Sequence, residues 1–472
     1  MKTIGLLFIV VLVFTSCKVK SKTNTFDHTE GHGHSHYSSL SHVPAHKLIF
    51  PSKAPDRIIL NLTEDPHHSV AINWRTDQDI DTAYVEIAEE THGPDFLLNN
   101  NVTRVSAKTE FLDLENVRDK EPVVKAAFHS AILKDLKPGT TYVYRVGDGQ
   151  ANNDTWSEWF QIKMPSKNKE DAFSFIYFGD AQNDVKSMWS RVIRKSYKML
   201  PDVDFMLHAG DLINHSESDR EWGEWFYAGS FIHATVPSIM TPGNHEYDKM
   251  KDRSKLSSLW RPQFNLPQNG PLEALNETCY TLDYQNLKLI SLDSQSFNND
   301  ETSRNAQVKW LDSVLQSNTK KWVAITMHHP IFSTAKGLDN IALREAIKPL
   351  IDKYKVDLVL QGHDHTYARG YDSNETSGKT IVEDAGAIYA VSVSGPKMYE
   401  SQDQSWMVKR GEFTQLFQII TIDNDTLKYN SYTTMGSLYD SFRLIKENGS
   451  NTLINNSELN EFTRFKKDFI KE

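Results

Sequence analysis

The chain has 472 residues, of which 39% are hydrophobic and 11% aromatic, a composition typical of a globular protein long enough for about three domains. Acidic residues outnumber basic residues by 62 to 52, which gives a formal net charge of −10 at neutral pH. This balance supplies no basic field, and it therefore argues against DNA or RNA as a dedicated partner.

The first 17 residues have the pattern of an export signal. Lys2 supplies a positive charge, residues 4–14 are apolar, and Cys17 follows a Thr-Ser pair. An apolar run of this length is too short to span a bilayer, which needs about 20 residues. The segment resembles a bacterial lipoprotein signal, so we expect cleavage before Cys17, lipidation of that residue, and a membrane-anchored protein that faces the periplasm or the cell surface. An ordinary signal peptide, in which Cys17 is incidental, is the alternative.

Only one other cysteine exists in the chain, Cys279. If Cys17 is acylated, no intrachain disulfide can form in the mature protein. We expect Cys279 to be a small buried apolar residue and not a nucleophile.

Residues 18–54 are predicted to form a disordered, His-rich tether. Six of the chain's 18 histidines lie within residues 28–46, among Ser, Gly and Thr residues. Such a composition cannot bury an apolar core, and a solvated linker is the favoured interpretation. The alternative is that these histidines capture zinc, which would make the protein a metal-scavenging lipoprotein.

Between residues 55 and 165 apolar residues alternate along the chain, which predicts an all-β domain. The alternation is clearest at residues 70–74, 84–87 and 141–146. With Trp74 as a buried indole and Tyr142 as a corner tyrosine, the domain resembles a fibronectin type III module. We expect it to be a packing platform for the domain that follows. A surface binding protein, in which this module adheres to a glycan or a partner, is the alternative.

Five short polar motifs follow at the ends of five apolar runs. The runs, which are short enough to be buried strands, cover residues 173–178, 203–207, 237–240, 322–326 and 356–360. The motifs that close them are Gly179-Asp180, Gly210-Asp211, Gly243-Asn244-His245-Glu246, Met327-His328-His329-Pro330 and Gly362-His363-Asp364-His365. Because ligands gather beyond the carboxyl ends of strands in open α/β sheets, we expect all five motifs to meet at one edge of a sheet.

Helices are predicted between these motifs, because apolar residues recur there at spacings of three and four. They cover residues 185–199, 308–315 and 341–351. Alternation returns at residues 417–422 and 427–432, which predicts a second, largely antiparallel set of strands.

The motifs supply carboxylate, amide and imidazole groups and no thiolate. This donor set suits Fe, Mn or Zn, whereas a site for calcium alone would contain no imidazole. Two such ions, on the order of 3.5 to 4 Å apart, can clamp the attacking and leaving oxygens of an in-line displacement at phosphorus. The sequence therefore predicts hydrolysis of a phosphoric ester, with two divalent or mixed-valence metal ions as cofactors.

The ordered series of motifs resembles that of the calcineurin-like metallophosphoesterases and, within that superfamily, of the purple acid phosphatases. The resemblance spans roughly residues 55–445 and implies a catalytic α/β domain at residues 170–446, in which helices flank a sandwich of two mixed sheets. It also implies the metal ligands: Asp180 and His365 for one ion, Asn244, His328 and His363 for the other, and Asp211 for both.

The resemblance also implies a mechanism, in which a hydroxide that bridges the metals attacks phosphorus. His245 would stabilise the phosphoryl oxygens or protonate the leaving alkoxide, the alternative being a structural bond to Asp211. His329 either contacts the substrate or packs the loop, and Glu246 and Asp364 are expected to orient the neighbouring histidines. We expect phosphomonoesters as substrates, with a phosphodiesterase or a nucleotide-hydrolysing enzyme as the alternative.

Two positions depart from the purple acid phosphatase pattern. The family has Tyr three residues after the bridging Asp and usually Gly two residues after the first Asp, where this chain has Asn214 and Gln182. Gln182 or Asn214 could offer an amide oxygen to the first metal, water could fill that position, or each side chain could bond the loop backbone. Because a tyrosinate on ferric iron gives the family its colour, Asn214 predicts a colourless protein.

Residues 447–472 are rich in Asn and Ser and are predicted to be a polar tail. Leu459, Phe462 and Phe469 allow a short amphipathic helix within this tail. We expect such a helix to dock onto the catalytic domain and not to bind the membrane.

Overall fold

The computed structural model describes residues 50–97, 101–114, 123–151, 153–248, 252–372, 380–456 and 462–464. The predicted signal segment, Cys17 and most of the His-rich tether therefore lie outside the described residues. Within the described part of the chain, no helix combines the length and the apolar character that are needed to cross a bilayer.

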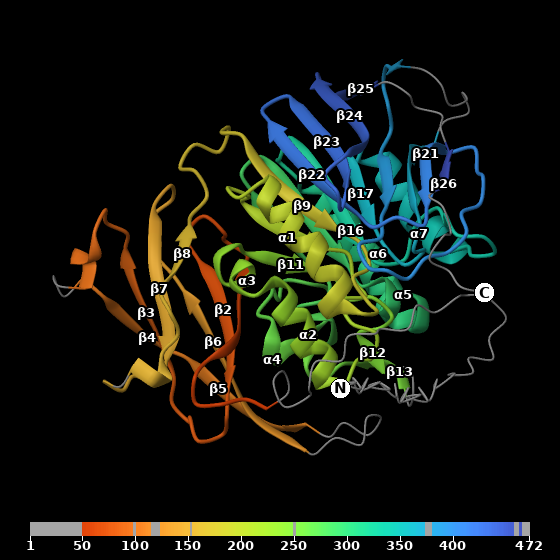
Figure 1. The fold of residues 1–472 in the computed structure, drawn as a ribbon. Helices are drawn as coiled ribbons and strands as arrows, with labels where there is room; N and C mark the ends of the chain where they lie inside the picture. Colours follow the sequence, from red (N-terminus) through yellow and green to blue (C-terminus); the bar gives the residue numbers. More distant parts are fainter. Residues whose placement is uncertain are drawn as a thin grey trace, which may run out of the picture. The chain divides into compact units, whose positions relative to one another are not determined.

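The N-terminal domain is a β-sandwich, which confirms the all-β prediction (Figure 1). One layer has the order β1-β2-β6-β5 and the other the order β4-β3-β7-β8. The strands are β1 (Asp56–Leu62), β2 (Val70–Thr76), β3 (Tyr84–Glu89), β4 (Thr103–Ser106), β5 (Lys108–Leu114), β6 (Val124–Leu133), β7 (Thr141–Gly147) and β8 (Phe160–Lys163). Trp74 is 1% exposed in the core between the layers. The hydroxyl of Tyr142 accepts a hydrogen bond from the Lys137 N–H at 2.9 Å, as a corner tyrosine does.

The second domain, which the sequence predicts to be catalytic, contains two mixed sheets. In the first, β9 (Phe173–Phe178), β10 (Phe205–His208) and β11 (Ser238–Met240) are parallel neighbours, and β22 (Leu416–Asp423), β23 (Thr426–Thr433), β24 (Leu438–Glu447), β25 (Ser450–Asn455) and β19 (Ile381–Val382) continue it as antiparallel strands. At the other edge, Asn61 of β1 pairs with Ser238 of β11, so one layer of the N-terminal sandwich extends this sheet.

The second sheet has the order β14-β15-β16-β17-β20-β18-β21-β26. Its strands are β14 (Tyr280–Tyr284), β15 (Leu287–Leu292), β16 (Trp322–Met327), β17 (Leu358–Gln361), β20 (Ile388–Val391), β18 (Tyr367–Tyr371), β21 (Met407–Glu412) and β26 (Phe462–Arg464). The four strands β15, β16, β17 and β20 are parallel. A separate hairpin joins β12 (Tyr247–Asp248) and β13 (Asp252–Leu256).

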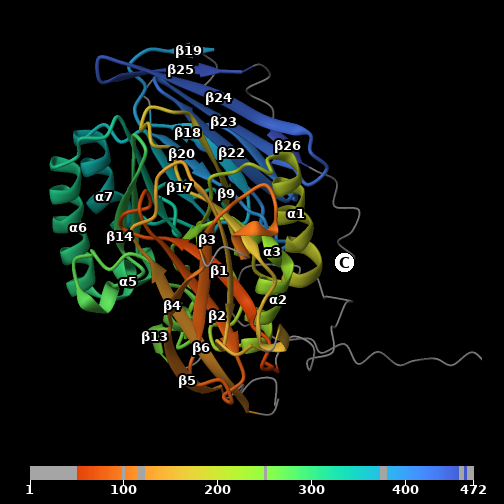
Figure 2. The same cartoon turned by 90° about the vertical axis from the view of Figure 1, so that its left-hand side faces the viewer.

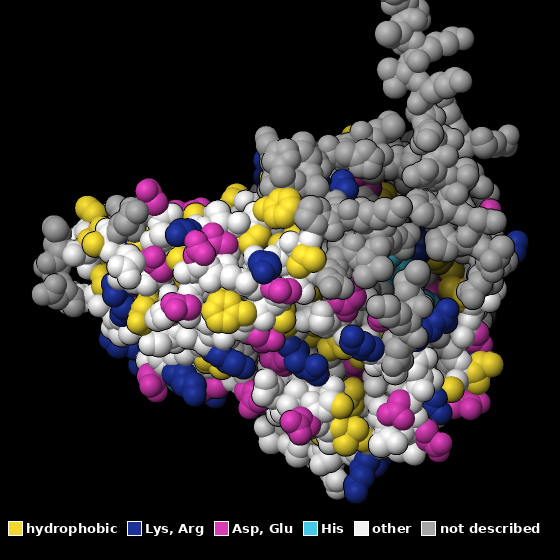
Figure 3. All heavy atoms as spheres, turned by 90° about the horizontal axis from the view of Figure 1, so that it is seen from below, with side chains coloured by type: hydrophobic (Ala, Val, Ile, Leu, Met, Phe, Trp, Pro, Cys, Tyr) yellow, Lys and Arg dark blue, Asp and Glu magenta, His cyan; other side chains and the backbone are white. Residues whose placement is uncertain are grey.

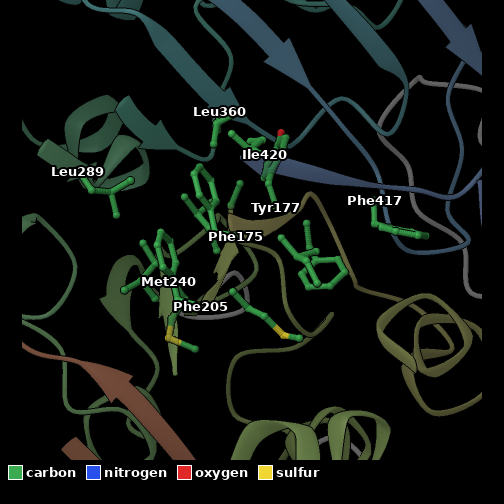
Figure 4. Packing of buried hydrophobic residues seen from close by; sticks show 14 of the residues in the cluster. Phe175, Tyr177, Phe205, Met240, Leu289, Leu360, Phe417 and Ile420 are labelled. Carbon is green, nitrogen blue, oxygen red and sulfur yellow. The ribbon is translucent and has the colours of Figure 1, made fainter. Parts of the chain in front are cut away.

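The two sheets pack face to face over an apolar core (Figure 4). Phe175 and Tyr177 of β9 contribute to this core from the first sheet, and Leu289 and Leu360 contribute from the second. Phe178 of β9 faces the helices, where its ring lies 6.0 Å from that of Trp189. A strand that is covered on both faces needs apolar residues at nearly every position, which explains why β9 is apolar except at Ser174.

Helices cover the outer faces of the sandwich (Figure 2). On the first sheet lie a π-helical turn (Val185–Trp189), α1 (Ser190–Met199), α2 (Asp219–Gly229) and α3 (Phe231–Thr235). On the second lie α5 (Ser294–Asn299), α6 (Glu301–Gln316) and α7 (Ile341–Lys353), and the short α4 (Trp260–Gln263) contacts β2 and β6. The three predicted helices are confirmed, and so is the two-sheet sandwich flanked by helices.

Two expectations are corrected. The five apolar runs do not belong to one sheet, because β9, β10 and β11 lie in the first sheet and β16 and β17 in the second. The predicted polar tail is partly folded, since β25 and β26 are strands, and the latter occupies part of the segment where a helix was expected. The rest of that segment, residues 457–461 and 465–472, lies outside the described residues.

Because of its asparagines, the segment that forms β25 was predicted to be part of a polar tail. Asn451 and Asn455 are buried, and they bond the charged side chains of Asp357, which precedes β17, and of Arg369 in β18. Asn451 donates to Asp357 Oδ1 at 2.7 Å, and Arg369 donates to Asn455 Oδ1 at 2.6 Å. On the face shown in Figure 3, basic and acidic side chains are interspersed over the described surface, in keeping with the nearly balanced charge of the sequence.

Candidate metal centre

The strand ends of the two sheets bring all the predicted ligands together. Asp180, Asp211 and Asn244 follow β9, β10 and β11 of the first sheet, whereas His328, His363 and His365 follow β16 and β17 of the second. Two hydrogen bonds show how the sheets meet: His363 N–H donates to Asp180 Oδ1 at 2.6 Å, and His328 Nδ1–H donates to the Ala209 carbonyl at 2.9 Å.

The ligand atoms form two overlapping clusters. One consists of Asp211, His328 and His363, the other of Asp180, Asp211 and His365, and within each cluster the atoms lie within 4.8 Å of one another. Asn244 Oδ1 joins the first cluster, at 3.1 Å from His328 Nε2 and 3.0 Å from His363 Nδ1. Because Asp211 belongs to both clusters, its carboxylate is placed to bridge two ions.

Main-chain carbonyls fix the tautomers of two of these histidines. The Nδ1–H groups of His328 and His365 donate to the carbonyls of Ala209 and Lys397, at 2.9 and 3.1 Å. Each ring therefore directs Nε2 to the cluster, and this nitrogen can bind a metal when it is deprotonated. His328 Nε2 lies 3.2 Å from Asp211 Oδ2, and His365 Nε2 lies 3.4 Å from Asp180 Oδ2.

The glycines of the motifs are required by close packing around these ligands. A Cβ atom on Gly243 would lie 2.2 Å from Asp211 Oδ1, and one on Gly362 would lie 2.3 Å from Asp180 Oδ1. Three proposed ligands, Asp211, His363 and His365, also have positive φ angles of 52°, 74° and 46°. Such backbone conformations are unfavourable for residues other than glycine and concentrate at functional sites.

Glu246 and Asp364 hold loops in place, which corrects the expectation that they orient histidines. The carboxylate of Glu246 accepts from the main-chain N–H groups of Asp211, Leu212 and Gly243, at 2.7 to 2.8 Å. Asp364 accepts from groups of residues 333–335, including the Ser333 hydroxyl at 2.7 Å. Both carboxylates therefore act on the backbone of neighbouring loops.

Burial strongly perturbs the titration of the site. It raises the pKa of Asp180 to about 7 and lowers the pKa values of His363 and His365 well below the ordinary value. Burial also opposes protonation of His328, but Asp211 and Asp180 outweigh it and raise the pKa of His328 to about 9. A buried carboxylate whose pKa is raised by burial is stabilised in its charged form by a nearby cation, such as a bound metal ion.

A buried carboxylate oxygen of Asp180 fits a metal at the first position, and, within the described residues, a buried amide oxygen of Gln182 is unsatisfied nearby. Asp180 Oδ2 and Gln182 Oε1 are buried and have no hydrogen-bond partner among the residues that the structure describes. Buried polar atoms without a partner are costly, and each such atom requires an explanation. The oxygen and nitrogen donors that surround them suit Fe, Mn or Zn.

The two residues that depart from the purple acid phosphatase pattern are placed differently. The Gln182 amide nitrogen lies between two proposed ligands, 2.8 Å from Asp211 Oδ2 and 3.0 Å from His365 Nε2. The Asn214 amide instead turns to the ring of His215, at 3.0 Å. Of these two side chains, therefore, Gln182 lies within the cluster of Asp180, Asp211 and His365, whereas the Asn214 side chain contacts His215.

His245 faces the cluster from the loop that carries Asn244. Its Nδ1–H donates to the Asn214 carbonyl at 2.6 Å, which turns Nε2 towards Asp211 Oδ2 at 3.8 Å. Its main-chain N–H donates to Asp211 Oδ1 at 2.8 Å, so the structural bond to Asp211 comes from the backbone. His329 bonds Ser294 Oγ at 3.0 Å, and its ring lies 4.3 Å from that of His363, a proposed ligand.

A sixth strand end adds residues that the sequence analysis did not consider. Lys397 and Tyr399 follow β20, whose neighbour in the sheet is β17. The ring of Tyr399 lies 4.6 Å from that of His365, and the charges of Asp211 and Asp180 act on Lys397. The apolar run at residues 387–393, followed by Ser-Gly-Pro-Lys, is the same kind of signal as the five motifs and could have identified them.

Comparison with known families matches both domains. Residues 55–164 match the model of the purple acid phosphatase N-terminal domain, and residues 173–367 match that of the calcineurin-like phosphoesterases. Among solved structures, the purple acid phosphatase PPD1 from yellow lupin seeds superposes with a TM-score of 0.68 at 20% identity, over 84% of this chain and 75% of that one. This likeness shows the fold.

Three relatives illustrate the similarity in sequence. Probable inactive purple acid phosphatase 24 of Arabidopsis thaliana is 24% identical over 358 residues, which are 68% of this chain and 58% of the relative. Acid phosphatase type 7 of Homo sapiens is 26% identical over 68% of this chain and 71% of the relative. Fe(3+)-Zn(2+) purple acid phosphatase 12 of Arabidopsis thaliana is 27% identical over 51% of this chain and 52% of the relative. The chain thus spans only 58% of the length of the first of these proteins.

Proposed function

We propose that this chain, which carries a purple acid phosphatase N-terminal domain followed by a calcineurin-like phosphoesterase domain, hydrolyses phosphomonoesters at a dinuclear metal centre. The observation that carries the proposal is the pair of donor clusters that share Asp211. Of the relatives, some are named acid phosphatases and three are named probable inactive purple acid phosphatases. All six predicted ligand positions of this chain hold donor side chains at the centre, which supports an active enzyme.

The proposed ligands divide between two ions. Asp180, His365 and Gln182 would hold the first ion and Asn244, His328 and His363 the second, with Asp211 between them. When bound, a pair of ions activates water and withdraws charge from the phosphoryl oxygens. The name of the Fe(3+)-Zn(2+) relative supports a mixed-valence pair of iron and zinc as one option, and the donor set also suits Mn.

The residues of the chain supply the remaining steps. His245 would donate a proton from Nε2 to the leaving alkoxide, because its Nδ1–H is already engaged with the Asn214 carbonyl. Glu246 would keep the Asp211 loop rigid by holding three main-chain N–H groups. A rigid frame of this kind lowers the reorganisation that accompanies catalysis.

The decisive experiment measures metal content and hydrolysis together. A panel of phosphomonoesters, phosphodiesters and nucleotides is tested with Mn, Zn and Fe, and the proposal expects the highest kcat/KM for monoesters. Asp211→Asn should lower both metal occupancy and turnover, since this carboxylate neutralises two ions. Turnover by Asp211→Asn that equals wild type would refute the two-metal centre, and a preference for diesters or nucleotides would favour that alternative.

The His-rich tether provides the control for the non-enzymatic alternatives. A metal-scavenging protein would lose its ions when residues 18–50 are deleted, whereas the proposed enzyme would retain about two ions per chain and its activity. A surface binding protein would bind its glycan or partner without hydrolysing any ester of the panel.

We also propose that the enzyme is exported and anchored through lipid on Cys17. The support is the sequence pattern of residues 1–17. Mass spectrometry of the mature N-terminus should find an acylated cysteine, and Cys17→Ala should release the protein from the membrane fraction. An unmodified N-terminus that begins elsewhere would contradict the anchor and leave the proposed activity untouched.

A further inference from the structure

We propose that Lys397 forms an anion-binding subsite beside the metal centre, which selects phosphoric esters that carry a second anionic group near the scissile phosphate. The inference rests on the proposed function, because it names the substrate class of that same site. The second anion is a carboxylate or a further phosphate, since both offer oxygen acceptors to an ammonium group.

The segment that carries Lys397 is fixed against two of the proposed ligands. On one side of it, Gly395 N–H donates to the Asp180 carbonyl at 2.5 Å. At Lys397 itself, the carbonyl accepts from His365 Nδ1–H at 3.1 Å, and Tyr399 N–H then donates to the His365 carbonyl at 3.2 Å. Because these contacts lie on both sides of Lys397 and at its own carbonyl, the main chain places this residue at the edge of the centre.

The far end of the same segment is also held. Lys336 N–H donates to the Glu400 carbonyl and Gln402 N–H donates to the Thr334 carbonyl, both at 2.9 Å. The loop that contains Thr334 is in turn fixed by the buried carboxylate of Asp364. A binding group on a segment with so many main-chain contacts is preorganised, which lowers the entropy lost when a ligand is bound.

Lys397 makes a cation–π contact but no ion pair within the described part of the chain. Its ammonium lies 5.3 Å from the centre of the Tyr399 ring. The side chain is half-buried, and the carboxylates that act on its charge are Asp211 and Asp180. Both are proposed metal ligands, so two bound ions would take up the negative charge that Lys397 now faces.

With both ions bound, a half-buried ammonium group would remain beside the centre. Leaving such a charge unpaired is unfavourable, and an anion of the substrate is the group that can satisfy it. The scissile phosphoryl group is engaged with the metals in the proposed reaction. A second anionic group on the same substrate is therefore the complement of Lys397.

Matched pairs of substrates test the subsite. O-phosphoserine and its methyl ester differ by one carboxylate charge, and propane-1,3-diol bisphosphate and the monophosphate differ by one phosphate. Lys397→Met should raise KM about tenfold for the more anionic member of a pair, the loss expected for one charge-assisted hydrogen bond, and leave kcat and the other member unchanged. The two pairs show whether carboxylate or phosphate is preferred.

Two further variants serve as controls. Lys397→Arg keeps the charge and should retain most of the selectivity, whereas Lys336→Met removes an exposed lysine from the neighbouring loop and should change neither pair. Equal losses on both members of each pair would overturn the subsite, because Lys397 would then act on the scissile phosphoryl group or on the fold. No loss on any substrate would overturn it as well.

A binding measurement separates this inference from the proposed function. By calorimetry, the metal-loaded wild type should bind pyrophosphate more tightly than inorganic phosphate, and Lys397→Met should lose that preference. If the wild type hydrolyses neither member of a pair, the proposed function fails, but calorimetry still tests the subsite. If it hydrolyses both members and neither measurement shows a preference for the second anion, only the subsite fails.

Discussion

Replacing Asp219 by Asn is expected to destabilise the fold by about 4 kcal/mol, although this residue lies outside the metal centre. Asp219 is the first residue of α2, and it binds two arginines of the N-terminal sandwich. Its carboxylate accepts from Arg57 at 2.6 and 3.0 Å and from Arg75 at 3.2 Å. The side chains of all three residues are at most 4% exposed.

The magnitude follows from the charges that Asn would leave behind. Arg75 keeps Asp56, to which it donates at 2.9 and 2.7 Å, but Arg57 loses the carboxylate that accepts two of its hydrogen bonds. Burial and the charge of Arg75 already lower the pKa of Arg57, which shows that its cation is costly there. Removing one partner of a buried ion pair costs roughly 3 to 5 kcal/mol. At an unfolding entropy of about 2.1 cal/mol/K per residue, this loss lowers Tm by roughly 4 to 5 °C.

The assay is thermal unfolding followed by calorimetry and circular dichroism. Asp79→Asn is the control, because it breaks the Lys53–Asp79 pair at 3.2 Å, whose side chains are 58% and 69% exposed. That variant should change Tm by less than about 1 °C, as exposed ion pairs contribute little. A shift below about 1 °C for Asp219→Asn, or equal shifts for both variants, would refute the role assigned to the buried network. Metal content should be unchanged in the folded protein.

Three further predictions concern the catalytic domain. His245→Ala should retain both metals and slow alkyl phosphates far more than activated aryl phosphates, since only poor leaving groups need a proton; equal losses in a steady-state comparison would remove the acid role. The protein loaded with iron under air should be colourless, and its Asn214→Tyr variant should gain an absorption band in the visible spectrum. A visible band in the wild type would mean that another phenolate, such as that of Tyr399, binds the metal. Burial lowers the pKa of His233 to about 3, so on acidification the unfolded state is protonated at His233 before the folded state. The contribution of neutral His233 to the free energy of unfolding is therefore fully present above about pH 6.5, and the free energy of unfolding should be about 2 kcal/mol lower at pH 5. In denaturant titrations, an equal loss of stability between pH 7 and 5 for wild type and His233→Phe would contradict this.

The strands and the main helices were predictable because their patterns are local. The run that forms β9 has the predicted bounds, and α7 begins at the predicted Ile341. The assignment of strands to sheets was not predictable in this way. A buried run has the same composition in either sheet, and only long-range pairing, such as that between β10 and β11, separates the two. Cys279 is buried as expected, because the local sequence around it is enough to predict its burial.

The metal-binding side chains of the site were predictable from the sequence, whereas the residues that hold them in place were less predictable. Asp180, Asp211 and the histidines belong to motifs whose spacing is visible along the chain. Glu246 belongs to the same motif, but the N–H groups that it holds belong to two loops that meet only in the fold. Contacts between loops of different strands have no local pattern in the sequence. The sequence therefore identifies the metal ligands but not the residues that hold these ligands in place.

The two departures from the purple acid phosphatase pattern together change the proposed first metal site. Asn214 removes a phenolate donor from one loop, but its carbonyl still accepts from His245 Nδ1–H, and that bond does not depend on the side chain at this position. Gln182 replaces glycine on another loop and places an amide between Asp211 and His365. A neutral amide in place of a phenolate leaves the first site with one negative charge less. The proposed centre is therefore expected to favour a divalent ion at the position where the family holds a trivalent one.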